Sequence, residues 1–183
     1  MELRTERLLL RPFREEDAAA LYACSCEEEV GRSAGWKPHE SVEESADILH
    51  LVFLDQPTVW AIERRADSRL LGSVGLIADG ARQYGSARAL GYSLGRDYWG
   101  QGYMTEAVRC VLRFGFDRLR LDLVSATCYP ENHRSRRVLE KCGFCYEGTL
   151  RRAELLYNGE ICDHMHFCLL HETAEQLDLC TKK

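Results

Sequence analysis

The sequence predicts a single α/β domain with a central mixed, mostly antiparallel sheet of about seven strands and helices on both of its faces. Apolar residues recur at every second position in some segments and at three- and four-residue spacing in others, which predicts alternating strands and helices. A strand–helix–strand unit around residues 89–128 predicts one parallel pair with a right-handed crossover. The 183 residues suit one domain, with a core over about residues 3–170 and a short C-terminal tail.

The N-terminal half begins with a predicted strand over residues 8–11, which Pro12 stops. Apolar spacing predicts a helix over residues 15–23, and residues 27–40 are expected to mix short helix with loop. A helix over residues 42–54 opens with Ser41 and Glu44, the pattern of a capping box. Three strands follow as an antiparallel meander, because their connections are too short for crossovers: residues 58–63, 70–78 and 86–94.

The C-terminal half continues with helix, strand and helix. A helix is expected from the glycine-rich turn near residue 100 to about residue 116, and a strand over residues 122–129. The next helix, over residues 132–141, ends with Gly143 in a C-cap position. Two last strands, residues 144–155 and 160–171, meet at Asn158-Gly159, which is typical of a hairpin turn.

Composition and charge narrow the classes of function. The chain has 45% hydrophobic and 29% charged residues, as soluble globular proteins do. A net charge of −5 argues against nucleic acid as a partner and favours a cationic substrate. No apolar run has the length of a membrane span, so no membrane partner is expected, and the charged N-terminus is unlike a secretory signal. Nine cysteines, an odd number, predict reduced thiols and a cytoplasmic protein.

The segment Asp-Tyr-Trp-Gly-Gln-Gly-Tyr-Met-Thr-Glu-Ala at residues 97–107 predicts an anion site. Its two glycines lie between a strand and an amphipathic helix, where backbone N–H groups at the helix start attract an anion such as pyrophosphate. A dinucleotide-binding turn would have a third glycine where this chain has Thr105. A kinase-type phosphate loop would need a Gly-Lys pair, which the chain lacks. A glycine turn that only starts a helix is the plain alternative.

A second motif, Asn-His-Arg-Ser-Arg-Arg-Val-Leu-Glu-Lys-Cys-Gly-Phe, follows at residues 132–144. Together the two motifs resemble the coenzyme A loop and following helix of the GNAT superfamily of N-acetyltransferases. The opening Thr-Glu-Arg-Leu-Leu-Leu-Arg-Pro-Phe at residues 5–13 is similar to the ribosomal-protein N-terminal (Rim-type) branch, and so are Ala153-Glu154, Asn158-Gly159-Glu160 and Asp163. Asp97 stands where many superfamily members have Gln or Arg, and we interpret it as a marker of that branch.

The resemblance implies acetyl-CoA as acyl donor, with its pantetheine arm between two splayed strands, and no metal. Backbone N–H groups near the end of the strand over residues 86–94 are candidates to polarise the thioester carbonyl, and those of the glycine loop to hold the pyrophosphate. Arg134, Arg136 and Arg137 form a basic cluster, which is either a solvated helix face or, for at least one of them, a 3′-phosphate contact. The candidate cofactor-binding residues are Ser93, Leu94, Gly95, Gly100, Gln101, Gly102, Tyr103, Met104, Thr105, Asn132 and Arg137.

Two residues are the candidate catalytic groups. The resemblance places Ser135 near the cofactor thiol, where it would donate to or protonate the leaving thiolate; the alternative is helix capping, which Asn132 could serve. Glu154 matches the Ala-Glu pair of the branch and is the first candidate for the base. Asp163, His164 and Glu106 are weaker candidates, and Glu106 in the first turn of its helix could stabilise the helix alone.

The acceptor is expected to be a primary amine attacked in a ternary complex. A protein or peptide N-terminal α-amine, with a pKa of about 7.7, needs less help from a base than a lysine amine near 10.4. A small amine, such as a polyamine, an amino acid or an antibiotic, is the alternative acceptor. A non-catalytic acyl-CoA-binding module on the same fold is a second alternative, because fold does not establish activity. A homodimer is compatible with an enzyme and with a non-catalytic binding module.

Cysteine and histidine spacing raises one further alternative. Cys162, His164, His166 and Cys168 alternate along one predicted strand, so all four could face one side, as in a zinc site. An ordinary mixed strand face is the favoured interpretation. Cys142 and Cys145 have redox spacing but end a helix, whereas thiolate activation favours a helix N-terminus.

Overall fold

The computed structural model describes residues 1–82 and 84–179, and these residues divide into two compact units. Unit 1 contains residues 1–75 and 92–107, and unit 2 contains the described residues within 76–91 and 108–179. The strands β4 (Arg69–Ala78) and β5 (Ala87–Leu94) and the helix α4 (Tyr103–Asp117) each contribute residues to both units. We describe each unit by itself.

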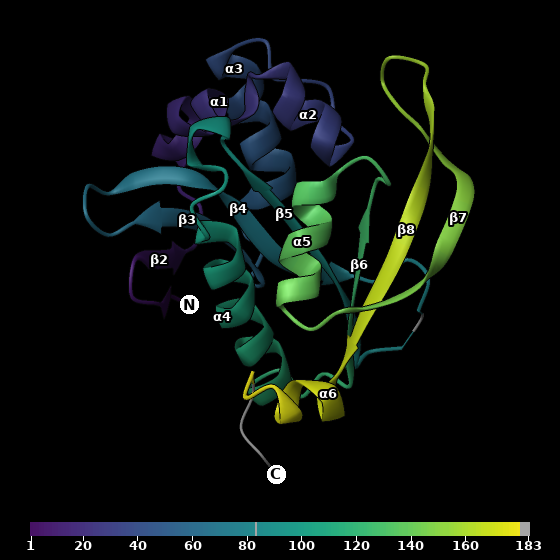
Figure 1. The fold of residues 1–183 in the computed structure, drawn as a ribbon. Coiled ribbons are helices and arrows are strands. Elements are labelled where there is room, and N and C mark those ends of the chain that lie inside the picture. Colours follow the sequence, from purple (N-terminus) through teal and green to yellow (C-terminus); the bar gives the residue numbers. More distant parts are fainter. Residues whose placement is uncertain (83, 180–183) are drawn as a thin grey trace. The chain divides into compact units, whose positions relative to one another are not determined.

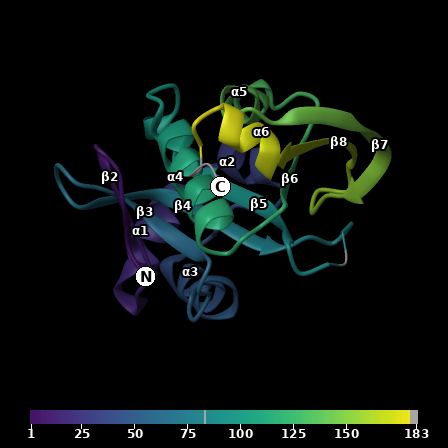
Figure 2. The same ribbon diagram turned by 90° about the horizontal axis from the view of Figure 1, so that it is seen from below.

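Unit 1 contains an antiparallel set of strands: β1 (Leu3–Arg4), β2 (Leu8–Arg11), β3 (Val59–Arg64) and the first part of β4. Strands β2, β3 and β4 lie side by side in both views (Figures 1 and 2). The register of β3 on β4 shifts between Ile62 and Glu63, where one extra residue of β4 forms a bulge. This bulge lies beside Gly72.

The helices of unit 1 are α1 (Ala18–Ser25), α2 (Glu28–Ala34) and α3 (Val42–Ile48). A 3₁₀ turn over Glu15–Asp17 leads into α1, and a π-helical turn over Leu49–Phe53 extends α3 to the predicted length. The expected cap is present, since Ser41 Oγ accepts from the Glu44 N–H. Helices α1 and α3 pack on one face of the strands and enclose an apolar cluster of Phe13, Leu21, Leu49, Val59, Ala61 and Leu70.

Unit 2 contains the strands β6 (Leu123–Cys128), β7 (Cys145–Leu155) and β8 (Ile161–Leu170) and the helices α5 (His133–Lys141) and α6 (His171–Gln176). Strand β6 pairs parallel to the first residues of β5, from Ala87–Leu123 to Ala89–Ser125, which confirms the expected parallel pair. Strand β8 pairs antiparallel to β6 and to β7. Figure 1 displays β7 and β8 as a long twisted hairpin. The turn between the two strands contains Gly159, whose φ of 86° suits the predicted hairpin turn.

The strands follow the hydrogen-bonded order β1-β2-β3-β4-β5-β6-β8-β7. The pairs β1–β2, β2–β3, β3–β4, β6–β8 and β7–β8 are antiparallel, and β5–β6 is parallel. The predicted mixed, mostly antiparallel sheet is therefore confirmed, with eight strands where about seven were expected. The additional strand is β1, whose two residues are too short to produce a periodic pattern.

The C-terminal segment differs from the expected short tail. Residues 171–176 form the helix α6, which packs against β8 and buries Ala174 completely. The predicted strand to residue 171 was thus one residue too long, and a helix follows directly. No helix among the described residues is long and apolar enough to span a membrane.

Candidate functional site

The glycine loop opens α4 in unit 1, as the sequence predicts. Gly100 and Gly102 have φ angles of 75° and 82°, which glycine adopts without the strain of a side chain. The first intrahelical bond runs from the Glu106 N–H to the Gly102 carbonyl, so the N–H groups of Tyr103 and Met104 precede the helical ladder. A β-carbon at Gly100 would meet no atom within 4 Å. The loop therefore leaves open the space in which a ligand could approach its backbone.

Side chains around the loop fix its backbone. The Trp99 indole N–H donates to the Leu94 carbonyl at 2.7 Å, and Gln101 Nε2 donates to the Asp97 carbonyl at 2.8 Å. Arg7 Nη1, from the turn between β1 and β2, donates to the Gln101 carbonyl at 3.0 Å. The loop is thus held by hydrogen bonds from both sides. Asp97, which departs from the usual superfamily pattern, takes part through its main chain.

The end of β5 supplies the next three predicted residues, Ser93, Leu94 and Gly95. A β-carbon on Gly72 would lie 2.1 Å from the Ser93 carbonyl oxygen, so only glycine allows β4 and β5 to approach this closely. The Gly95 N–H donates to the Leu71 carbonyl at 2.8 Å and is thus committed to the sheet. Ser93 Oγ lies 3.1 Å from Ser73 Oγ. Three N–H groups were expected to polarise the thioester carbonyl. One of them, the Gly95 N–H, is therefore already bonded to a backbone acceptor.

Helix α5 carries the remaining predicted cofactor residues in unit 2. Asn132 caps the helix, since its side-chain oxygen accepts from the Ser135 N–H at 3.0 Å. The alternative role proposed for Ser135, capping, is thus performed by Asn132. Arg137 is exposed, and Arg136 pairs with Glu140 one turn further along the helix. The capping bond uses the backbone N–H of Ser135 and not its hydroxyl.

Glu154 lies at the centre of a polar cluster in unit 2. Its Oε2 accepts from the Tyr129 hydroxyl at 2.7 Å and lies 2.8 Å from His164 Nε2. Tyr129 is buried, and burial together with the neighbouring Glu154 carboxylate raises the pKa of its phenol above its usual value. The structure brings His164, a weaker candidate from the sequence, into contact with the leading candidate. The pair is a carboxylate that orients an imidazole.

A bulge in β7 sets the position of Glu154. The register of β7 on β8 shifts between Leu150 and Glu154, and Arg152 within this interval has a φ of 51°. The Arg152 N–H donates to Asp163 Oδ1 at 2.8 Å, so the Asp163 carboxylate stabilises the bulged backbone. Sequence reasoning considered Asp163 as a base and missed this role, because a bulge leaves no periodic signal. It also missed Tyr129, which ends the predicted strand over residues 122–129 as an ordinary aromatic residue.

Glu106, another weaker candidate for the base, is engaged in unit 1. Burial alone would raise the pKa of its carboxyl, but hydrogen bonds from Thr5 and Arg7 outweigh this and lower the pKa below its usual range. A carboxylate with a lowered pKa is a poorer base. The structure therefore favours a structural role for Glu106.

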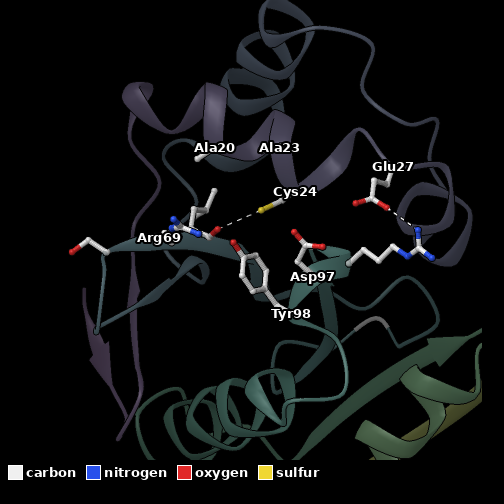
Figure 3. A pocket seen from close by; sticks show the side chains of 11 residues that line it. Ala20, Ala23, Cys24, Glu27, Arg69, Asp97 and Tyr98 are labelled. Carbon is white, nitrogen blue, oxygen red and sulfur yellow. Dashed lines mark hydrogen bonds and ion pairs between the residues drawn. The ribbon is translucent and has the colours of Figure 1, made fainter.

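A hollow of about 370 Å³ lies in unit 1 between α1, the start of β4 and the turn after β5 (Figure 3). Cys24 faces it and donates its thiol to the Leu70 carbonyl at 3.4 Å, while Glu27 and Arg96 form an ion pair at the rim. Burial, with smaller contributions from Cys26 and Asp97, raises the pKa of Cys24 to about 12. This thiol is protonated at neutral pH and is a poor nucleophile.

The cysteine and histidine row of β8 lacks the grouping of side chains that a metal site needs. Among residues 1–82 and 84–179, no three histidine, cysteine or acidic side chains are grouped to hold a metal ion. His164 is engaged with Glu154, and Cys162 and Cys168 are partly buried. The ninth cysteine, Cys180, lies outside the described residues. The zinc alternative thus gains no support.

The predicted site residues fall into the two units. Unit 1 holds Ser93 to Gly95 and the glycine loop to Thr105, and unit 2 holds Asn132, Ser135, Arg137 and Glu154. Within unit 1, the loop and the end of β5 are joined through Trp99 and Leu94. Within unit 2, Glu154 lies with Tyr129 and His164, and Asn132 caps α5.

Comparisons with known proteins agree with this geometry. The sequence model of the family described as "Acetyltransferase (GNAT) domain" matches residues 7–145. The uncharacterized N-acetyltransferase YoaA of Bacillus subtilis (strain 168) is 32% identical over 154 residues, covering 82% of this chain and 86% of YoaA. The [ribosomal protein uS5]-alanine N-acetyltransferase of Escherichia coli (strain K12) is 34% identical over 76 residues, covering 42% of this chain and 39% of that protein. The crystal structure of a GNAT-family acetyltransferase from Bacillus anthracis superposes with a TM-score of 0.82 at 25% identity, covering 94% of this chain and 99% of that chain.

Proposed function

This chain belongs to the GNAT acetyltransferase family, and from that premise we propose that it transfers the acetyl group of acetyl-CoA to an N-terminal α-amine of a protein or peptide. The observation that carries the proposal is the loop in which Gly100 and Gly102 both have positive φ angles directly before α4. We also propose that the chain forms a single domain and that the protein is cytoplasmic, as expected from the length and the cysteine content of the chain.

Acetyl-CoA would be held largely by backbone. The loop N–H groups from Gln101 to Thr105 take the pyrophosphate, where the positive end of the α4 dipole favours an anion. The end of β5, at Ser93 and Leu94, offers N–H groups to the thioester carbonyl, while that of Gly95 is bonded to Leu71. Asn132 and Arg137 on α5 remain candidates for cofactor contacts, and Arg137 is exposed and free to approach a phosphate.

The amine loses a proton during attack, and Glu154 with His164 is our proposed acceptor of that proton. Tyr129 and His164 both contact Oε2 of this carboxylate, and no described residue donates to Oε1. Oε1 is therefore placed to accept from the amine or from a water that the amine protonates. Because Glu154 and His164 are in direct contact, their titration belongs to the pair rather than to either residue.

Attack forms a bond between the amine nitrogen and the acetyl carbon, and the carbon–sulfur bond then breaks. The departing thiolate takes a proton or a hydrogen bond, and Ser135 is our proposed donor. Direct transfer is supported by the buried thiols: burial raises the pKa of Cys128 and Cys142 to about 11. These thiols are unsuited to carry the acetyl group as an enzyme intermediate.

The α-amine is favoured over lysine for a physical reason. A group with a pKa of about 7.7 is partly neutral at physiological pH, whereas a lysine amine near 10.4 costs roughly 3–4 kcal/mol to deprotonate. The E. coli relative named for uS5 alanine supports a protein terminus as acceptor. The net charge of −5 suits a basic ribosomal tail, and it suits a small basic amine equally.

The test is acetyl transfer to a panel of acceptors, measured as thiol release and as product mass. The panel pairs peptides with free N-termini with the same peptides blocked at the N-terminus, and adds polyamines, amino acids and aminoglycosides. Product on the free peptides alone is the expected result. Product on small amines alone would reject the protein acceptor and keep the enzyme, and acetyl-CoA binding without any product would favour a non-catalytic module.

The cofactor loop has a separate test with a matched control. Gly102→Val should abolish acetyl-CoA binding, because a β-branched residue is strained at the φ of 82° with which the loop presents its backbone, and its side chain meets Arg7. Gly159→Val is the control, since Gly159 has a φ of 86° in comparably open space within the β7–β8 turn. The control should bind acetyl-CoA as the wild type does. Unchanged binding in a folded Gly102→Val protein would reject the loop assignment.

A further inference from the structure

The N-terminal turn of unit 1 is bonded to the first turn of α4. Glu106 Oε1 accepts from Thr5 Oγ1 at 2.6 Å and from the Arg7 N–H at 2.9 Å, and Glu106 Oε2 accepts from Arg7 Nε at 2.7 Å. The Glu106 side chain is 19% exposed. Three donors thus hold one partly buried carboxylate in a fixed position.

Arg7 extends from this carboxylate to the loop. Its Nη1 donates to the Gln101 carbonyl at 3.0 Å, and its guanidinium lies 4.4 Å from the centre of the Tyr103 ring. Its Nη2 is the atom that a β-carbon on Gly102 would meet, at 3.5 Å. The planar guanidinium therefore lies along residues 101–103 of the loop and donates to the carbonyl of the first of them.

Holding the Gln101 carbonyl also orients an N–H group. The carbonyl of Gln101 and the N–H of Gly102 belong to one planar peptide group, and in a trans peptide they point in opposite directions. Since Arg7 fixes the carbonyl on its own side of the loop, the Gly102 N–H points away from Arg7. Gln101 is anchored a second time through its side chain, which donates to the Asp97 carbonyl.

Charge compensation is a second reason for an arginine at position 7, beside the loop. Glu106 lies in the first turn of α4, where its negative charge suits the helix dipole but opposes a phosphate bound at the same helix end. The ion pair with Arg7 offsets that charge at 2.7 Å. The loop can thus keep a carboxylate as its anchor without repelling an anionic ligand.

We propose that Arg7 is a positioning residue for the cofactor loop: bound to Glu106, it fixes the Gln101–Gly102 peptide so that the Gly102 N–H faces the pyrophosphate. This inference rests on the proposed function, since it assumes that acetyl-CoA binds at the loop. Arg7 acts through the backbone and contributes to cofactor affinity, not to the acyl-transfer step.

The test compares acetyl-CoA with S-acetylpantetheine, a donor that lacks the pyrophosphate. Arg7→Ala should raise the Kd and KM for acetyl-CoA by about 10- to 100-fold, the size of a lost charged hydrogen bond. The KM for S-acetylpantetheine and the kcat with saturating acetyl-CoA should stay within about twofold. A merely structural role would weaken both donors together, and that result would overturn the proposal.

Arg65→Ala is the matched control. Arg65 Nη1 donates to the Thr5 and Glu6 carbonyls, both at 2.9 Å, and so supports the same N-terminal turn without a recorded contact to the loop. This variant should keep wild-type affinity for acetyl-CoA. An equal loss of affinity in Arg65→Ala and Arg7→Ala would assign the effect to the turn as a whole and overturn the proposal.

Arg7→Lys keeps the test decisive if Arg7→Ala does not fold. A lysine amine retains the charge but cannot reach Glu106 and the Gln101 carbonyl through a planar fork. Affinity for acetyl-CoA should therefore remain at least about fivefold below that of the wild type, and full recovery would overturn the proposal. Failure of the wild type itself to bind acetyl-CoA would instead reject the proposed function.

Discussion

The cofactor loop and the β7–β8 hairpin position their functional groups in opposite ways. The loop presents backbone N–H groups, and side chains from a distant segment, such as Arg7, hold that backbone. The hairpin presents a side chain, Glu154, and an irregular backbone at Arg152 sets its direction. The loop, which offers backbone N–H groups, depends on glycine and on side chains that hold its backbone. The hairpin, which offers a side chain, depends on a bulge and on a residue that stabilises the bulge.

The two regions also differ in what a substitution should affect. Anchors of the loop, such as Glu106, should change cofactor affinity and local stability, because Glu106 holds Arg7, which donates to the loop backbone. Anchors of the hairpin, such as Asp163, should change kcat, because they set the direction of a proposed catalytic group. Substitutions in the two regions test this division.

Glu154→Gln is expected to have the largest effect. It should lower kcat/KM by about 10²- to 10³-fold below the pKa of the acceptor amine, because the amide cannot accept the proton. The defect should shrink as pH rises, since more of the amine is already neutral. A pH profile of kcat/KM measures this. A defect that is constant with pH would mean that Glu154 positions His164 and does not receive the proton.

Ser135→Ala should lower kcat by about 10²-fold with little change in the Kd for acetyl-CoA. Helix α5 should remain intact, because Asn132 accepts from the Ser135 backbone N–H, which the substitution retains. Ser135→Thr keeps a hydroxyl and is the matched control, with activity well above that of the alanine variant. Single-turnover kinetics check the effect, and near-normal rates in Ser135→Ala would exclude this serine as the acid.

Asp163→Ala should lower kcat by roughly tenfold and the free energy of unfolding by about 1–2 kcal/mol, because the Arg152 N–H loses a charged acceptor. Arg151→Ala, an exposed substitution beside the bulge, is the control and should change neither quantity appreciably. Steady-state kinetics and denaturant unfolding supply the measurements. A stability loss with unchanged kcat would separate the bulge from the position of Glu154.

Glu106→Gln should have the smallest effect on kcat, with a loss of about 1–3 kcal/mol in the free energy of unfolding at pH 7. The pKa of Glu106 is lowered from 4.5 in the folded protein, so its contribution is complete above about pH 5 and is lost as pH falls through the folded pKa. The difference from the wild type should therefore shrink on acidification.

The matched control for Glu106 is Glu140→Gln. Glu140 forms an exposed pair with Arg136 on α5, and such pairs contribute about 0.5 kcal/mol or less. Urea unfolding of both variants at pH 7 and at pH 3.5 makes the comparison. A loss for Glu106→Gln that is equal at the two pH values would mean that its ionised carboxylate does not stabilise the loop.

The sequence predicted the course of the chain well, because most elements carry a periodic apolar pattern and a marked end. Strand β2 begins and ends as predicted, α3 is opened by the Ser41 cap, and the hairpin turn lies at Gly159. The exceptions are β1 and α6, which are too short to produce a period. Local signals of this kind depend on neighbouring residues alone.

By itself the sequence determined the family, the glycine loop as a candidate cofactor site and Glu154 as a candidate base, since each depends on a contiguous motif. Only the tertiary structure decided which groups surround these motifs: Arg7 and Glu106 are 99 residues apart, and Tyr129 and Glu154 are 25 apart. The physical reason is that hydrogen bonds across such separations depend on strand register and bulges. A shift of one residue in register turns every side chain of a strand to the other face, and no short motif records that choice.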